Sequence, residues 1–241
     1  MLKNITALYD NALVALDGDI GQVKDCYFDD QTWVVRYLVA NTGEWLTGRV
    51  VLLSPHAFGS WDEQKKTLQI KLTKRQIEGS PAIESHQPVS RQHEIAYYRY
   101  YGWPAYWDGG AMWGLGAYPM VRPPTKDQME SHLNYHHRES KHLRSSRAVA
   151  GYQIESIGGA IGHVSGLMVD DRSWAVREIA VKTGHWFSGK EILIPTGKVE
   201  RISYDESKVY VNVTKEDILE TADHGLVRAG AAAHGSAHFS D

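Results

Sequence analysis

Residues 29–53 read DDQTWVVRYLVANTGEWLTGRVVLL. Residues 170–194, which lie 141 positions further along, read DDRSWAVREIAVKTGHWFSGKEILI. Both stretches hold an acidic pair, an arginine, two tryptophans and two glycines at one fixed spacing. The repeated residues are Trp33, Arg36, Gly43, Trp45 and Gly48, then Trp174, Arg177, Gly184, Trp186 and Gly189. Residues 20–77 and 161–218 give 16 identities in 58 pairs at this offset, so the sequence predicts two copies of one fold.

The first copy has the pattern of short strands separated by turns. Its β-branched and aromatic runs, which suit a pleated surface, cover residues 12–16, 21–28, 33–41, 49–53 and 67–72. Thr73 and Gln76 have the spacing of a capping box, which predicts a short helix that ends at Gly79. Short strands with glycine turns at this spacing are typical of a small antiparallel barrel.

The sequence therefore predicts an all-β protein with two small antiparallel barrels. We expect the first barrel at residues 1–80 and the second at 147–222. An aromatic and histidine-rich linker at 81–146 joins them, with one short helix at about 126–138. Residues 223–241 are rich in glycine and alanine, which predicts a disordered tail.

Composition limits the functional classes. The chain has 241 residues, 42% of them hydrophobic, with a net charge of -3 and a pI near 6.5. No strongly basic field is present, so we expect no nucleic-acid partner. The single Cys26 is interpreted as a buried apolar residue in a reducing compartment. We find no signal peptide and no apolar run long enough to span a bilayer, so we expect a soluble, cytoplasmic protein.

The repeated motifs resemble those of the PRC-barrel family. The resemblance is carried by Asp-Asp-x-x-Trp-x-Val-Arg, by Thr-Gly-x-Trp-x-x-Gly, and by the closing Thr-Lys with an isoleucine. That family includes the cytoplasmic domain of the photosynthetic reaction centre H subunit and the C-terminal domain of a bacterial ribosome maturation factor. The resemblance implies a non-enzymatic bacterial module that binds partners, although fold membership alone does not assign a role. We recognise no counterpart of the H subunit's membrane helix in residues 1–241 and therefore expect its specific role not to carry over.

The linker is the least ordinary segment because it concentrates aromatic residues between glycines and prolines. Its candidate partner-binding residues are Tyr97, Tyr98, Tyr101, Trp103, Tyr106, Trp107 and Trp113. One interpretation is an ordered loop whose rings cover apolar surface of the barrels. The other is an interface, where tyrosine and tryptophan are enriched as anchors. Because glycines and prolines interrupt residues 97–118, we expect no regular helix there beyond the first turn or two.

Histidines of the linker and the repeated arginines are the other candidates for binding or structural roles. His132 and His136 lie four positions apart on the predicted helix, a spacing at which two histidines can share a metal, but no cysteine joins them. We interpret them as part of a polar helix and expect no metal and no cofactor. Arg36 and Arg177 lie in apolar strands, so each is expected to meet a carboxylate. The repeated tryptophans and glycines are interpreted as structural anchors.

No catalytic triad, P-loop or dinucleotide motif is recognised, so the sequence does not predict an enzyme. The favoured hypothesis is an interaction or assembly protein that binds a protein partner or self-associates. One alternative is an accessory factor of photosynthesis or membrane electron transport, peripheral to the inner membrane. The other is a metal-dependent activity at the linker histidines.

Overall fold

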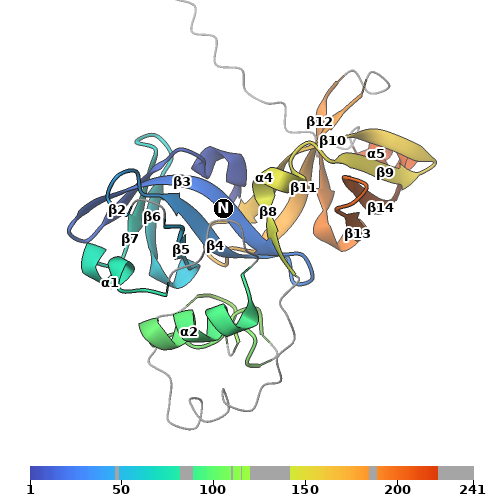
Figure 1. The fold of residues 1–241 in the computed structure, drawn as a ribbon. Coiled ribbons are helices and arrows are strands. Elements are labelled where there is room, and N and C mark those ends of the chain that lie inside the picture. The colour runs from blue at the N-terminus through green and yellow to red at the C-terminus, as the bar shows by residue number, and fades with distance from the viewer. Residues whose placement is uncertain are drawn as a thin grey trace, which may run out of the picture. The chain divides into compact units, whose positions relative to one another are not determined.

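The computed structural model describes residues 1–46, 49–81, 89–109, 111–114, 116–119, 142–184 and 189–221. The chain forms two compact units. Unit 1 consists of Met1–Ala150 with Gly166–Glu178, and unit 2 of Gly151–Ser165 with Ile179–Asp241. Both are mostly β, as predicted, with few helices (Figure 1). Among the described residues, no helix has the length and apolar character needed to cross a membrane.

Unit 1 is built on a sheet in which six strands follow the order β5-β4-β3-β2-β7-β6, and β8 pairs with β3 outside this path. The strands are β2 (Ala12–Ala15), β3 (Gly18–Asp29), β4 (Val34–Asn41), β5 (Val51–Leu53), β6 (Phe58–Asp62), β7 (Thr67–Ile70) and β8 (Leu143–Ser145). β6 and β8 were not predicted. All neighbours pair antiparallel except β2 and β7, which run parallel.

The burial pattern of β4 explains where the core of unit 1 sits. Every residue from Val34 to Ala40 is buried, so this strand is covered on both faces. β7 instead alternates, with Leu68 and Ile70 buried and Gln69 exposed, as the sequence predicts for a half-exposed strand. Cys26 is fully buried in β3, which confirms its interpretation as a core residue.

The first tryptophan of each repeat, Trp33 or Trp174, lies just before a strand rather than within it. Trp33 and Trp174 have φ angles of 56° and 60°, which is the left-handed region, whereas the sequence predicts that each begins its strand. The acidic residue four positions earlier explains the turn. Asp29 Oδ1 accepts hydrogen bonds from two backbone N–H groups of its turn, and Asp170 Oδ1 does the same. Asp side chains commonly fix tight turns in this way.

The capping box predicted at Thr73 and Gln76 is present. Their side chains and backbone N–H groups bond reciprocally, and helix α1 (Lys74–Glu78) ends at Gly79. An equivalent arrangement joins Thr214 and Asp217 at the start of helix α5 (Lys215–Thr221). Local hydrogen-bond chemistry therefore sets both helix starts.

A second sheet has the order β12-β11-β10-β9-β14-β13, and β1 pairs with β10 outside this path. Its strands are β1 (Leu2–Asn4), β9 (Gln153–Ile157), β10 (Gly159–Asp170), β11 (Val176–Thr183), β12 (Glu191–Pro195), β13 (Val199–Ser203) and β14 (Lys208–Thr214). The parts of these strands that belong to unit 2 bury a core of Ile154, Ile161, Ile179, Val181, Ile192 and Val209. The end of β10 and the start of β11 belong to unit 1.

The linker contains two elements that were not predicted, strand β8 and a helix. The helix is α2 (Arg91–Tyr101). Ser90 caps its first turn by accepting from the His93 N–H, and Gly102 ends it with φ 67°. The helix predicted at about 126–138 and the tail predicted at 223–241 fall outside the described residues.

Candidate functional site

Helix α2 carries the first of the predicted partner-binding aromatics into unit 1. Residues three and four positions apart share a helix face, and Glu94, Tyr97 and Tyr98 are buried together on one such face. The Tyr97 hydroxyl donates to the Leu52 carbonyl of β5 at 3.0 Å, and it accepts from the Ser54 N–H at 3.1 Å. These bonds fix α2 against the edge of the sheet (Figure 1).

Most of the predicted partner-binding rings are buried by the chain itself. The buried ones are Tyr97, Tyr98, Trp103, Tyr106 and Trp113, whereas Tyr101 and Trp107 are half-buried. Among these rings, the centroids of contacting pairs lie 4.4–6.3 Å apart, mostly edge-on, the geometry that aromatic pairs favour. The five buried rings therefore cover the sheet of unit 1 and are not a free docking surface, which corrects the interface interpretation for them.

Arg36 of β4 is held under this aromatic cover. Its guanidinium carbon lies 3.8 Å from the Tyr106 ring centroid and 4.9 Å from that of Trp113. Nη1 donates to the Met112 carbonyl at 2.7 Å, and Nη2 lies 4.0 Å from a carboxylate oxygen of Asp29. The predicted carboxylate contact is thus present, although stacking and the carbonyl bond are closer.

Its counterpart Arg177 lies in a different environment. Arg177 is exposed in β11, whereas Arg36 is 1% exposed. Trp174 is buried against Phe58 and Trp61, with ring centroids 4.7 and 6.4 Å away. The repeated residues therefore share backbone positions without sharing burial.

Glu94 forms a buried acidic centre that the sequence did not indicate. Its Oε1 accepts from the Tyr37 hydroxyl at 2.9 Å and from the Tyr106 hydroxyl at 2.7 Å. Arg91 Nη1 lies 3.0 Å from Oε2 as an ion pair without hydrogen-bond geometry. Burial raises the pKa of Glu94, and Arg91 and the two hydroxyls oppose this shift. The sequence signal that could have predicted this centre is the spacing of Glu94, Tyr97 and Tyr98, which places them on one face of a helix.

His56 is the second buried titratable group that was missed. Its ring stacks on Trp103 with centroids 5.3 Å apart, and Trp113 meets it edge-on at 5.1 Å. Nδ1 lies 3.1 Å from the Ser54 hydroxyl. Burial, with a smaller contribution from Arg36, lowers the pKa of His56 to about 3, so this imidazole is neutral at physiological pH.

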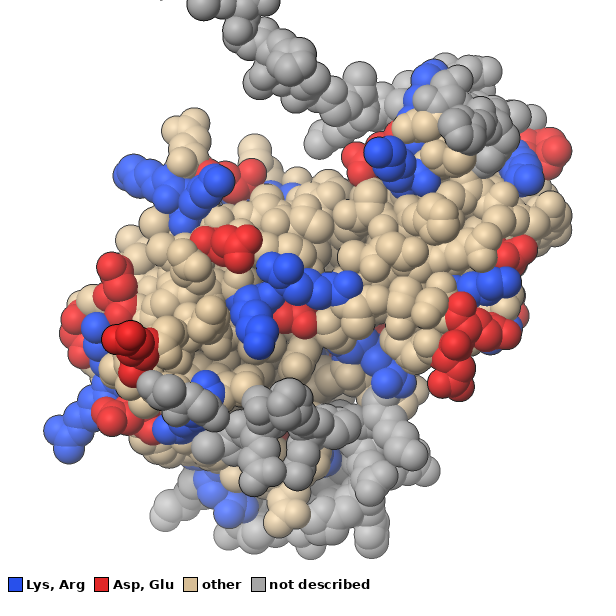
Figure 2. All heavy atoms as spheres, turned by 45° about the horizontal axis from the view of Figure 1, so that its top comes forward, with Lys and Arg blue, Asp and Glu red and all other residues tan. Residues whose placement is uncertain are grey.

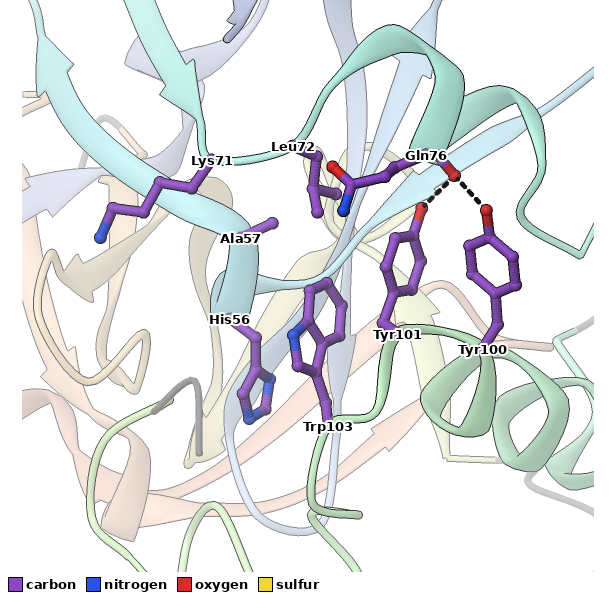
Figure 3. A pocket seen from close by; sticks show the side chains of 8 residues that line it. All are labelled: His56, Ala57, Lys71, Leu72, Gln76, Tyr100, Tyr101 and Trp103. Atoms are coloured by element: carbon purple, nitrogen blue, oxygen red, sulfur yellow. Dashed lines mark hydrogen bonds between the residues drawn. The ribbon is translucent and has the colours of Figure 1, made fainter. Parts of the chain in front are cut away.

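A pocket of about 370 Å³ opens between α1 and the C-terminal end of α2 (Figure 3). The residues that line it are His56, Ala57, Lys71, Leu72, Gln76, Tyr100, Tyr101 and Trp103. Figure 3 shows the Tyr100 and Tyr101 rings pointing from α2 toward Gln76, whose backbone carbonyl accepts from both hydroxyls at 2.9 and 3.5 Å. Tyr100, which was not among the predicted partner-binding residues, is 44% exposed.

The pocket combines ring surface with a polar rim. Lys71 and Gln76 are exposed at its edge, and Tyr101 is half-buried in its wall. Such a mixture of aromatic and polar groups suits recognition of a surface or a segment of another molecule. Arg75 and Glu78 line a neighbouring pocket that shares Gln76 and Tyr100, so the concave surface continues along α1.

The remaining predicted site residues are placed as follows. Trp45 is half-buried, with Lys74 Nζ 5.7 Å from its ring centroid, and Gly43 and Gly189 have positive φ in their turns. Gly184 is half-buried after β11. Gly48, Trp186, His132 and His136 lie outside the described residues. Within the part of the chain that the structure describes, no three His, Cys, Asp or Glu side chains form a group that fits a metal ion.

Comparison with known proteins identifies the second repeat. Residues 151–218 match the family model of the PRC-barrel domain. No curated protein matches the sequence. The matched segment runs from before β9 into α5 and contains all six strands from β9 to β14. The chain therefore contains a PRC-barrel domain at residues 151–218.

Proposed function

We propose that this protein is a non-enzymatic interaction or assembly protein built from two duplicated PRC-type barrels. The observation that carries the proposal is the PRC-barrel domain at residues 151–218, a domain associated in general with protein interaction and assembly. The common strand order of the two sheets supports the duplication. β5-β4-β3-β2-β7-β6 corresponds strand for strand to β12-β11-β10-β9-β14-β13.

The close approach of two backbones at the start of β3 and β10 also supports duplication and barrel curvature. A side chain at Gly21 would collide with the Asn41 carbonyl, and one at Gly162 would collide with the Lys182 carbonyl. The two positions are 141 residues apart, as are their partners. Glycine at such a point allows a strand to bend sharply across its neighbour.

We propose that a protein partner docks on unit 1 at the pocket between α1 and α2. Tyr100 and Tyr101 supply ring surface there, and Lys71 and Gln76 supply polar groups. This composition resembles the core and rim of protein interfaces. Figure 2 shows Lys and Arg side chains mixed with Asp and Glu on the face in view, which fits a protein better than a polyanion.

A photo-crosslinking amino acid at position 100 tests the docking site in cells of the source organism. The matched control carries the same amino acid at position 157, because Ile157 is a 55% exposed residue of β9, outside the pocket. We expect a single recurrent protein adduct from position 100 that position 157 does not give, and that Tyr101→Ala weakens. Equal adducts from both positions, or none, would contradict the docking site.

A role beside photosynthetic or other membrane electron transport is the narrower form of this proposal. Its support is the PRC-barrel resemblance to the reaction centre H subunit. It requires that the adduct from position 100 be a subunit of an electron-transport complex and that the protein co-sediment with membranes. An adduct with a protein unrelated to electron transport would exclude it.

A further inference from the structure

Strands β1 and β8 make equivalent pairings at a fixed offset. Both are short segments that precede the first strand of a repeat, and 141 residues separate Leu2 from Leu143. β1 pairs with β10 as Leu2↔Asp170, Lys3↔Val169 and Asn4↔Met168. β8 pairs with β3 as Leu143↔Asp29, Arg144↔Phe28 and Ser145↔Tyr27. Each strand thus pairs with the repeat to which it does not belong, in the same register.

The bonds at the ends of these ladders are reciprocal as well. The Asp171 N–H donates to the Met1 carbonyl at 3.0 Å, and the Asp30 N–H donates to the His142 carbonyl at 3.0 Å. The side chains follow the same pattern. Arg144 Nε donates to Asp30 Oδ2 at 3.0 Å, and Lys3 Nζ lies 3.8 Å from Asp171 Oδ2.

The turns before β4 and β11 are hydrogen-bonded to each other. Val34 and Ala175, which are equivalent residues, form an antiparallel bridge with each other. The Val35 N–H donates to the Trp174 carbonyl at 2.8 Å, and the Val176 N–H donates to the Trp33 carbonyl at 2.7 Å. The two hydrogen bonds are therefore equivalent, because each joins the valine of one repeat to the tryptophan of the other. Such reciprocal contacts are typical of a two-fold, isologous interface.

All of these residues lie in unit 1, so one compact body contains the whole arrangement. Strand β8 pairs with an edge of β3, and β1 pairs with an edge of β10. Without these two strands, the backbone N–H and C=O groups on those edges would lack their strand partners. Adding a strand to a sheet edge is a common mode of recognition, because its main-chain hydrogen bonds supply affinity.

We propose that β1 and β8 are reciprocally exchanged strands, and that the surface they complete recognises a second copy of the same module. In this protein the second copy is the other half of the same chain. The proposal rests on the duplication described above and deepens the assembly function by naming the partner as a PRC-type module. It follows that the covalent linker is not needed to hold the halves together.

The test uses the full chain with a site-specific protease sequence inserted between residues 130 and 131. After cleavage, native mass spectrometry and light scattering are expected to show the two fragments as one 1:1 complex near the mass of the uncut chain, 27.1 kDa. Separation of the fragments while circular dichroism still reports β-structure would overturn the proposal.

Two double variants separate strand exchange from other contacts between the fragments. Because Met1 and Asp171 are hydrogen-bonded opposite each other, ladder alternation makes Lys3 the next residue whose N–H faces β10, and Arg144 the equivalent residue facing β3. Lys3→Pro with Arg144→Pro removes these donors. Lys3→Ala with Arg144→Ala removes only the side chains.

We expect the proline pair to weaken fragment association at least tenfold relative to the alanine pair. Equal dissociation constants for the two pairs would contradict the exchange. The crosslinking assay at position 100 uses the uncut chain and does not depend on β1 or β8. Loss of the external partner would therefore leave this inference standing, and separation of the fragments would leave the docking site standing.

Discussion

The guanidinium carbon of Arg36 lies 3.8 Å from the centroid of the Tyr106 ring, in the interior of unit 1. A planar guanidinium stacks on an aromatic face and donates in a fixed fork, and a lysine ammonium does neither. Arg36 also satisfies the Met112 carbonyl. This one side chain therefore connects β4 to the loop that follows α2.

Replacing Arg36 by lysine is expected to lower the free energy of unfolding by about 2–3 kcal/mol, because stacking and the carbonyl bond are lost at a buried site. Urea unfolding followed by tryptophan fluorescence measures the change. Arg177→Lys is the matched control, since Arg177 is the exposed equivalent, and it should change stability by less than about 0.5 kcal/mol. Similar losses in both variants would refute the assignment of Arg36 to the core.

The neutral His56 predicts a stability that depends on pH. Burial lowers its pKa to about 3 in the folded protein, whereas the unfolded chain binds a proton below about 6.5. The free energy of unfolding should therefore decrease as pH falls from about 6.5 toward 3, by at most about 1.4 kcal/mol per pH unit from this group. Urea unfolding at pH 7, 6 and 5 measures the slope.

His56→Asn should reduce that slope, and His163→Asn should not, because His163 is exposed. The comparison between variants is needed because Glu94 changes the free energy of unfolding with pH in the direction opposite to His56. Burial raises the pKa of Glu94, so its contribution to stability is present at low pH and is lost as pH rises through the folded pKa. An unchanged slope in His56→Asn would show that His56 does not remain neutral.

Trp33 and Trp174, whose backbones are both in the left-handed region, form a second matched pair. Trp174→Ala should cost about 3–5 kcal/mol, because the ring is buried against Phe58 and Trp61. Trp33 is half-buried and stacks on Phe28, with centroids 5.7 Å apart, so Trp33→Ala should cost about 1–2 kcal/mol. Both residues have nearly the same φ, so backbone effects cancel in the comparison. Guanidinium unfolding measures the free energy of unfolding of both variants. A larger decrease for Trp33→Ala than for Trp174→Ala would contradict the prediction.

Gly162→Ala should lower stability by about 2 kcal/mol or more, because the added methyl group would collide with the Lys182 backbone carbonyl. Gly197→Ala is the control, since nothing lies within 4 Å of a methyl group there and no positive φ is required. Thermal unfolding should show a lower midpoint for the first variant and an almost unchanged one for the second. Equal midpoints would mean that the strands do not approach closely at Gly162.

The local elements can be predicted from the sequence, because they depend on neighbouring residues. The aspartate turns at Asp29 and Asp170, the capping box of Thr73 and the alternation of Leu68 with Gln69 follow from side-chain chemistry within four positions. Residues 151–218 likewise carry enough of the PRC-barrel pattern to be recognised.

Contacts in the folded chain set which equivalent residues are buried and where β1 and β8 pair. Arg36 and Arg177 occur in nearly the same local sequence, yet rings of the aromatic segment after α2 pack on Arg36, whereas Arg177 is exposed. The pairings of β1 with β10 and of β8 with β3 join residues more than 110 positions apart. Local periodicity specifies that a strand forms, but partner and register are set by contacts between segments distant in the sequence.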